Sequence, residues 1–313
     1  MSEPTGALAL DDLFDRRLSF PDSDARARFS RLVGIDGPKE RMCKLLGILS
    51  NPEGAAAWGR KHHRDARQLI DYVQRMPPLV VFAGDVGTGK TELAETIGDA
   101  VARQEGHSVT LYPMSLSTRG SGRVGEMTKL IAAAFDAAVT HARRLKRASG
   151  PSSGSIILLI DEADALAQSR ENSQMHHEDR AGVNALIRGI DRFAEARLPA
   201  VVILCTNRLS ALDPAVRRRA ADIFAFTRPN DEQRRAVLTK PLQELGFSPK
   251  HISELVTITG PGRKDGLGFT FSDLTQRLLP SLVIDAYPDK PVTFQRAAQV
   301  ASMITPTPAF RDS

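Results

Sequence analysis

The feature that most constrains the fold is a glycine-rich octapeptide, GDVGTGKT, between an apolar run and a helix-forming run. The apolar run LVVFA ends at Ala83, and the run TELAETIGDAVA begins at Thr91. Glycines let backbone N–H groups turn inward around phosphate oxygens, and the dipole of a following helix favours the same anion. Lys90 supplies a positive charge for the β- and γ-phosphates, and the Thr91 hydroxyl can ligate Mg²⁺. The pattern predicts that ATP and Mg²⁺ bind at Gly84, Asp85, Val86, Gly87, Thr88, Gly89, Lys90 and Thr91.

Short apolar runs alternate with helix-length stretches over the first two thirds of the chain. The intervening stretches carry apolar residues at helical spacing, as in Leu93, Ile97 and Val101. Continuous apolar strands that alternate with amphipathic helices indicate a parallel sheet covered by helices on both faces. We therefore expect an α/β core with a five-stranded parallel sheet. Its strands are predicted at 79–83, 109–112, 156–160, 200–205 and 223–226.

The strand pattern stops after Arg228, and the rest of the chain has the pattern of helices. Asn230 and Gln233 have the spacing of a capping box, which predicts the start of the first of these helices. Further helices are expected at 249–258, at 271–286 with a kink at Pro280, and at 293–304. The predicted organisation is a flexible N-terminal arm at 1–28, an α/β ATPase core at 29–228 and a small all-α lid domain at 229–313.

Two carboxylates follow the third apolar run, in the segment IILLIDEAD. Asp161 lies at the carboxyl end of that predicted strand, where it can hold Mg²⁺ through water. Glu162 is predicted to orient and activate the attacking water, because phosphoryl transfer depends on positioning and charge stabilisation. Asn207 ends the fourth apolar run, and its amide could orient the same water. A turn-forming asparagine is the alternative interpretation of Asn207.

Three adjacent arginines precede the fifth predicted strand, in the segment LDPAVRRRAADI. One local acid cannot neutralise all three side chains. One use for such a group is an arginine finger, a cation that one subunit supplies to the γ-phosphate bound by its neighbour. A solvated basic turn is the alternative.

Composition limits the other classes of function. The net charge of +5 permits a nucleic-acid partner, although arginines scattered over solvated helix faces are the favoured explanation. Aromatic residues make up only 5% of the chain, which argues against a surface that stacks single-stranded bases. Cys43 and Cys205 show no pairing pattern, which fits a reducing, cytoplasmic setting. No apolar run is long enough to span a membrane, and the N-terminal residues do not resemble a secretory signal.

The order of these motifs resembles that of an AAA+ ATPase of the classical AAA group, over about residues 29–304. The resemblance implies that the segment FSRLVGIDG contacts the adenine through Val33 and Ile35. It implies that Asn207 is the sensor 1 residue, and that Arg218 and Arg219 form the arginine-finger pair. Fingers that act on a neighbouring subunit imply a ring, and the usual ring of this family is a hexamer.

Within that group, three segments resemble the pachytene-checkpoint ATPases, which remodel HORMA-domain proteins. They are RAGVNALIRGID at 180–191, RAADI at 219–223 and PVTFQRAAQV at 291–300. The chain has no room for the separate N-terminal substrate-binding domain of the eukaryotic members, so it resembles the compact bacterial ones. Those are associated with HORMA proteins and cyclic-oligonucleotide synthases in anti-phage signalling (CBASS). The implied task is to disassemble an activated HORMA–synthase complex.

The chain departs from the family pattern at two places. Pore loop 1, which normally presents an aromatic residue to the substrate, corresponds here to STRGSGRVGE at 117–126. Substrate contact there is assigned to Arg119, Gly120, Ser121, Arg123 and Val124, with a solvent loop as the alternative.

The second departure is Ser272, which occupies the sensor 2 position where the checkpoint ATPases have an arginine. Residues 51–77 match no part of the family pattern with certainty. Trp58, the single tryptophan, either packs between subunits or covers the core.

The sequence thus predicts a hexameric, ATP-hydrolysing remodeller of a protein partner. Two other classes stay open at this stage. A DNA-directed AAA+ loader or initiator is suggested by the basic net charge. A nucleotide-gated scaffold that scarcely hydrolyses ATP is the other, and Glu162 speaks against it.

Overall fold

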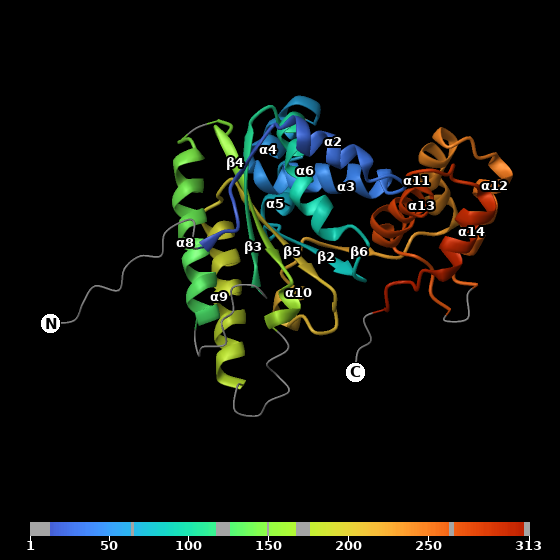
Figure 1. Cartoon of the computed structure of the whole chain (residues 1–313). Coiled ribbons are helices and arrows are strands. Elements are labelled where there is room, and N and C mark those ends of the chain that lie inside the picture. Colours follow the sequence, from blue (N-terminus) through green and yellow to red (C-terminus); the bar gives the residue numbers. More distant parts are fainter. Residues whose placement is uncertain are drawn as a thin grey trace. The chain divides into compact units, whose positions relative to one another are not determined.

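The computed structural model is built around one mixed sheet and a group of C-terminal helices (Figure 1). It describes residues 13–63, 66–116, 126–148, 150–166, 176–262 and 266–309. The chain divides into two compact units. The first, unit 1, contains Met1–Phe29, Pro38–Ala83 and Thr91–Phe224, and the second, unit 2, contains Ser30–Gly37, Gly84–Lys90 and Ala225–Ser313.

Within the described residues, the sheet has six strands in the order β1-β3-β4-β5-β2-β6. The pairs β2–β5, β3–β4 and β4–β5 are parallel. All five strands expected from the apolar runs are present, so the α/β prediction is confirmed. They are β2 (Leu79–Gly84), β3 (Ser108–Ser115), β4 (Gly154–Asp161), β5 (Ala200–Thr206) and β6 (Asp222–Phe226).

The sixth strand, β1 (Leu18–Phe20), was not expected. It pairs antiparallel with β3, where Leu18 lies opposite Leu111. The Phe20 ring is buried, and it lies against Gly98, where a Cβ would collide with the ring. The prediction of a flexible arm is therefore wrong for β1 and for the start of α2 (Ser23–Arg31). A three-residue strand is too short to show the alternation by which strands are recognised in a sequence.

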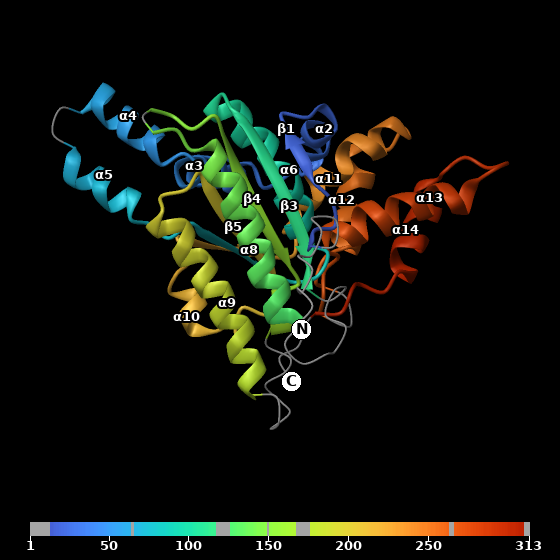
Figure 2. The ribbon, with the colours of Figure 1, turned by 90° about the vertical axis from the view of Figure 1, so that its left-hand side faces the viewer.

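Helices cover both faces of the sheet (Figures 1 and 2). On one face, α8 (Glu126–Leu145) and α9 (His176–Glu195) pack on alternate residues of β2, β4 and β5 to form the main hydrophobic core. Phe135 and Phe193 meet there with ring centroids 5.3 Å apart. Helices α3 (Asp36–Ser50) and α6 (Lys90–Glu105) lie on the other face. The helical spacing noted in α6 is confirmed, because Leu93, Ile97 and Val101 are fully buried.

Two further helices of unit 1, α4 (Pro52–His62) and α5 (Arg67–Gln74), form most of the segment that the family pattern left unassigned. They pack against each other, and Gly59 of α4 lies under the Ile70 side chain. Three of their apolar side chains remain exposed to solvent: Trp58, Leu69 and Tyr72 are 49, 59 and 65% exposed. About half of the Trp58 surface therefore remains uncovered by its own chain.

The C-terminal part of unit 2 is all-helical, as expected. Its helices are α11 (Asp231–Glu244), α12 (Pro249–Ile258), the π-helical η3 (Asp273–Leu278), α13 (Leu279–Ala286) and α14 (Phe294–Met303). The capping box is confirmed, since the Asn230 side chain accepts from the Gln233 amide and the Gln233 side chain accepts from the Asn230 amide. Pro280 lies in the first turn of α13, directly after the π-helical turn. Among the described residues, no helix has the length and apolarity needed to cross a membrane.

Candidate active site

The glycine-rich loop of unit 2 requires glycine for its shape. Gly84, Gly87 and Gly89 have φ of 152, 75 and 93°, a region that residues with a side chain rarely adopt. A Cβ at Gly84 would collide with the Phe226 carbonyl oxygen, so the loop could not sit against β6 with any other residue. The loop thus exposes its backbone amides to a bound anion by a conformation that only glycine permits.

Lys90 closes the loop on itself. Its ammonium donates to the backbone oxygens of Gly84 at 2.7 Å and Asp85 at 2.8 Å, and the residue is only 6% exposed. The Thr88 hydroxyl donates to the same Asp85 oxygen at 2.7 Å. The positive charge is therefore held among the loop's own carbonyls, where incoming phosphate oxygens can replace them as acceptors.

In unit 1, the hydroxyl that follows the loop meets the first carboxylate of β4. Thr91 Oγ1 donates to Asp161 Oδ2 at 2.8 Å, and the Glu162 amide donates to Asp161 Oδ1 at 2.8 Å. The sequence placed both residues at an Mg²⁺ site, and the structure brings them together. A hydroxyl and a carboxylate are oxygen donors of the kind that Mg²⁺ prefers, so this pair fits that ion.

The second carboxylate, Glu162, is held by a residue that the sequence did not reveal. Ser115 Oγ donates to Glu162 Oε2 at 2.6 Å. The contact arises because Ser115 ends β3 in register with Asp161 at the end of β4. Glu162 itself has φ of 55°, which is unusual for a residue with a side chain and turns the chain sharply at the strand end. Ser115 lies three residues beyond the strand that the sequence predicted at 109–112, so no pattern in the sequence indicated this bond.

Asn207 is positioned by a third acid of unit 1. The Asn207 backbone N–H donates to Asp164 Oδ1 at 3.1 Å, and the Thr206 hydroxyl donates to the same oxygen at 3.3 Å. Asp164 is 8% exposed and lies on the short 3-10 helix η1 (Ala163–Leu166) that follows Glu162. The sequence predicted a role for Asn207 but none for Asp164, which joins the ends of β4 and β5.

The three arginines have three different environments in unit 1. They begin at the end of the short helix α10 (Pro214–Arg217), whose N-cap is Asp213. Arg219 is paired within its own chain, because its guanidinium donates to both carboxylate oxygens of Asp191 at 2.9 and 3.2 Å. This pairing raises the pKa of Arg219. Arg218 is exposed, and its guanidinium has no partner within the described parts of the chain. Arg217 Nε is buried without a hydrogen-bond partner there.

The two residues assigned to the adenine lie in the short unit 2 segment before α3. Val33 is half-buried and packs on the hydrophobic core of the C-terminal helices. Ile35 is also half-buried, and between them Gly34 has φ of 81°. The Gly34 carbonyl accepts from the Gln233 side chain at 2.8 Å. Two apolar side chains thus flank a glycine turn that α11 fixes.

Ser272, at the sensor 2 position, contacts the phosphate loop through its backbone. Its amide donates to the Gly87 carbonyl at 3.0 Å, and its hydroxyl donates to Gln276 at 2.9 Å. A Cβ at Gly87 would crowd both Ser272 and Thr270. The pore-loop residues Arg119, Gly120, Ser121, Arg123 and Val124 lie outside the described residues, so their assignment stays a prediction.

A strand followed by a glycine loop that lysine closes, and paired carboxylates at the end of another strand of the same sheet, define a P-loop nucleotide-hydrolysing protein. The family "ATPase family associated with various cellular activities (AAA)" matches residues 80–228. CD-NTase-associated protein 6 of Escherichia coli strain MS 115-1 is 60% identical over 97% of this chain and 98% of its own length. The chain therefore belongs to the AAA family of ATPases, and it binds and hydrolyses ATP.

Two solved structures are also similar over nearly the whole chain. One is described as the structure of the E. coli MS115-1 HORMA:CdnC:Trip13 complex, with 59% identity and a TM-score of 0.89, and the match covers 98% of this chain and 100% of that one. The other is described as the structure of Rhizobiales Trip13, with 50% identity and a TM-score of 0.74 over 94 and 99% of the two chains.

Proposed function

We propose that this chain uses ATP hydrolysis to remodel a HORMA-domain protein in bacterial anti-phage signalling. The observation that carries the proposal is the 60% identity to a CD-NTase-associated protein over almost the full length of both chains. It is supported by the similarity to a chain from a complex with a HORMA protein and CdnC. The substrate is a HORMA protein bound to a cyclic-oligonucleotide synthase, and the product is the separated pair. The site of action is the cytoplasm.

The proposed chemistry assigns each described residue one task. The loop Gly84–Lys90 and Thr91 bind the triphosphate, and Val33 and Ile35 contact the adenine. Thr91 and Asp161 hold Mg²⁺, which when bound neutralises charge on the phosphates. Glu162, fixed by Ser115, accepts the proton of the attacking water, while Asn207 orients that water.

We further propose that the protein works as a homohexamer in which Arg218 acts on the neighbouring subunit's γ-phosphate. Arg218 is the exposed arginine of the three, whereas Arg219 is already engaged by Asp191. In this arrangement Arg219 fixes the α10 turn, and Arg218 projects from it.

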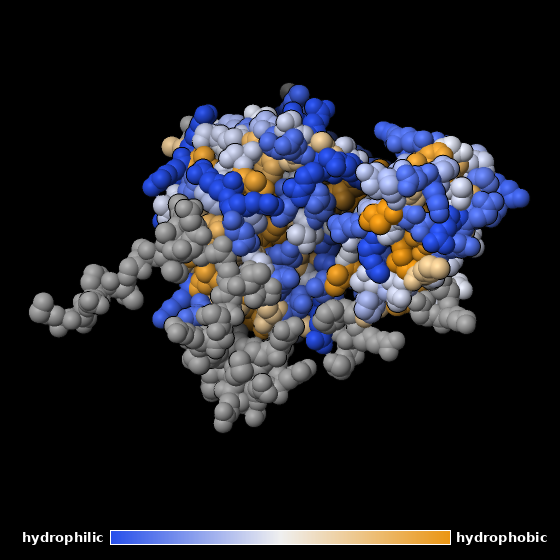
Figure 3. Space-filling model, viewed as in Figure 1, coloured by the Kyte–Doolittle hydropathy of each residue, from blue (hydrophilic) through white to orange (hydrophobic). Residues whose placement is uncertain are grey.

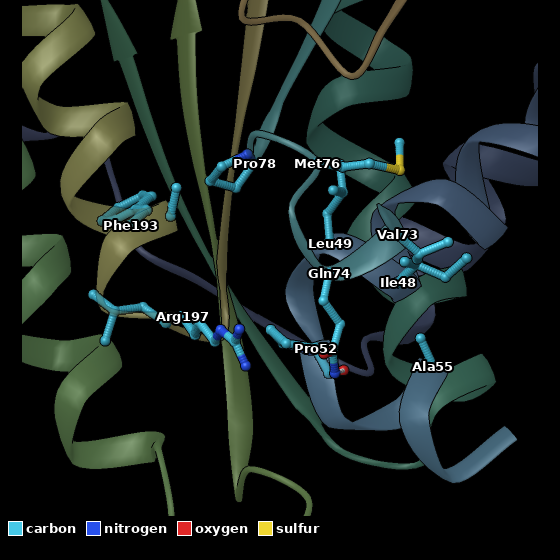
Figure 4. A pocket seen from close by; sticks show the side chains of 12 residues that line it. Ile48, Leu49, Pro52, Ala55, Val73, Gln74, Met76, Pro78, Phe193 and Arg197 are labelled. Atoms are coloured by element: carbon cyan, nitrogen blue, oxygen red, sulfur yellow. Dashed lines mark hydrogen bonds between the residues drawn. The ribbon is translucent and has the colours of Figure 1, made fainter. Parts of the chain in front are cut away.

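Exposed apolar side chains on both units support the proposed ring. In unit 1, a hollow of about 460 Å³ lies between α3, α4 and α5, beside the exposed Trp58 and Leu69. A smaller crevice of about 30 Å³ lies on the α9 side of α3 and α5, where the Arg197 side chain extends toward Pro52 and Gln74 (Figure 4). Such surface is costly to leave in water and marks an interaction site.

In unit 2, apolar surface is also gathered on the C-terminal helices (Figure 3). Ile284 and Tyr287 of the α13 region are 75 and 78% exposed. Two different apolar patches on one chain suit a head-to-tail contact, in which each copy offers one patch to the next, and such contacts form a ring where the rotation between copies closes. The variant Trp58→Glu is expected to lower the oligomer mass measured by light scattering with ATP. The exposed Tyr72→Glu on α5 tests whether the effect is specific to the hollow.

The deciding experiment uses a purified HORMA protein with its synthase from the same bacterium. Catalytic amounts of the ATPase with ATP and Mg²⁺ are expected to separate the pair on size exclusion and to reduce second-messenger synthesis. Glu162→Gln is expected to bind ATP and stay assembled without separating the pair. Continued second-messenger synthesis in the presence of an ATPase that turns over normally would refute the proposal.

The DNA-directed alternative rests on net charge alone, and a filter-binding titration at low salt tests it.

A further inference from the structure

Arg228, the second residue after β6, joins three separate segments of unit 2. Its guanidinium donates to Asp85 Oδ2 at 2.9 Å, to the Gly268 carbonyl at 2.8 Å and to the Thr307 carbonyl at 2.7 Å. The Arg228 side chain is only 14% exposed. A planar guanidinium can satisfy several acceptors in fixed directions at once, which a lysine ammonium cannot do in the same way.

Its first partner, Asp85, is the second residue of the phosphate loop. A carboxylate in a loop that binds a polyanion opposes that binding unless a cation neutralises it. Arg228 supplies this cation, at the edge of the loop and within one chain. The backbone oxygen of Asp85 accepts from both Lys90 and Thr88, so the position of Asp85 also sets the position of the loop lysine.

The third partner, Thr307, belongs to a network around Asp273, which is fully buried. Asp273 accepts from the Thr270 amide at 2.9 Å, the Thr307 amide at 3.0 Å and the Thr307 hydroxyl at 2.7 Å. Burial raises the pKa of Asp273, but these bonds together with one from Arg277 outweigh it, so the pKa lies below its ordinary value. The C-terminal segment that contains Thr307 is therefore held by a charged aspartate on one side and by Arg228 on the other.

We propose that Arg228 is a positioning residue for ATP binding, which neutralises Asp85 and ties the phosphate loop to the C-terminal segment at Thr307. The proposal rests on the assignment of the loop as the nucleotide site and adds a partner that neither the motif nor the relatives assign. It has two consequences. Loss of Arg228 weakens ATP binding because Asp85 is left charged, and nucleotide binding alters the protection of the Thr307 amide through the shared guanidinium.

The test is a set of ATP affinities, measured with a fluorescent ATP analogue on the full chain. Arg228→Gln is expected to raise the Kd about tenfold, which corresponds to about 1.4 kcal/mol. Asp85→Asn is expected to bind more tightly than the parent. The double variant Asp85→Asn/Arg228→Gln is expected to regain most of the lost affinity, because the charge that Arg228 neutralises is then absent.

Two other outcomes would overturn the proposal. If the double variant binds as weakly as Arg228→Gln, then Arg228 contacts the nucleotide itself or only supports the fold. If Arg228→Gln binds like the parent, the residue does not position the loop. Lys90→Ala separates these failures from a failure of the site assignment, since it should abolish binding in every background.

Hydrogen exchange provides a readout that a purely structural role does not move. In the parent chain, ATP is expected to change the exchange rate of peptides that contain Thr307. In Arg228→Gln, ATP is expected to leave that exchange rate unchanged. Arg228→Lys is expected to recover ATP affinity in part, because its single ammonium restores the charge without the three bonds. An unchanged nucleotide response at Thr307 in Arg228→Gln would refute the coupling.

Discussion

The hydrogen bond between Ser115 and Glu162 offers the sharpest test of the proposed hydrolytic chemistry. Replacing Ser115 by alanine removes one oxygen and leaves the β3–β4 pairing intact, because backbone groups make that pairing. The Glu162 carboxylate then loses the donor that fixes it at 2.6 Å. This contact therefore contributes to the direction of the Glu162 side chain, at a residue whose backbone conformation is also unusual.

The expected magnitude follows from the kind of bond that is lost. A hydrogen bond to a charged group contributes about 1.5–3 kcal/mol. Ser115 is only half-buried, so water replaces part of the lost hydrogen bond. We therefore take about 1.4 kcal/mol as the stabilisation of the transition state that is lost. That value corresponds to about a tenfold lower kcat. The KM for ATP is expected to stay the same, because the substitution alters the support of the proposed base and leaves the proposed phosphate-binding residues in place.

Steady-state phosphate release at saturating ATP and Mg²⁺ measures the effect, and binding of a fluorescent ATP analogue measures the affinity separately. Ser115→Thr keeps a hydroxyl and is expected to recover activity at least in part. Ser153→Ala is the matched control. It removes a serine hydroxyl that donates to the Leu145 carbonyl, and it should leave kcat unchanged. A Ser115→Ala protein with unaltered kcat, or with a raised KM alone, would refute the reasoning.

Three further predictions concern assembly, pH and packing. Arg218→Ala and Lys90→Ala subunits, each inactive alone, are expected to regain ATPase activity when mixed, because one keeps an intact phosphate loop and the other an intact finger. If a mixed oligomer recovers no activity, a finger that acts between subunits is excluded. Burial and the nearby Arg17 and Arg144 lower the pKa of His141, so protonation favours the unfolded chain. The free energy of unfolding should therefore fall as the pH drops below about 6.5. Urea titrations should show a smaller change of this free energy with pH for His141→Gln. Gly189→Ala is expected to cost about 1–3 kcal/mol of unfolding free energy, because a Cβ there collides with a buried aromatic ring.

Long apolar runs made most of the fold predictable from the sequence. Strands β2, β4 and β5 are buried on both faces, so hydrophobicity alone marks them. The capping box at Asn230 is also a local pattern, and the structure contains it. In contrast, β1 owes its existence to β3 and to the space above Gly98, both far away in sequence. Such an edge strand cannot be inferred from its own three residues.

The candidate site divides in the same way. Residues inside a motif, such as Lys90 and Asp161, could be named because the chemistry of phosphate binding restricts their type and spacing. Ser115 lies outside every motif, and Asp164 lies inside DEAD, but the role of each in supporting another residue could not be named from the sequence. Their contacts depend on strand register and on the turn after β4, which no spacing along the chain encodes.

The arginine triplet shows how local geometry assigns roles that composition leaves open. Consecutive residues at the end of a helix point about 100° apart, so Arg217, Arg218 and Arg219 must face different surroundings. The structure gives Arg219 an intramolecular carboxylate at Asp191 and buries Arg217 Nε, which leaves Arg218 as the exposed cation. If Arg218 serves a neighbouring subunit, then Asp191→Asn should also slow hydrolysis, because the released Arg219 loosens the turn that aims Arg218. An exposed ion pair contributes less than about 1 kcal/mol to stability, so the same substitution should scarcely change the melting temperature. A loss of activity that simply follows a loss of stability would show that Asp191 supports the fold and not the finger.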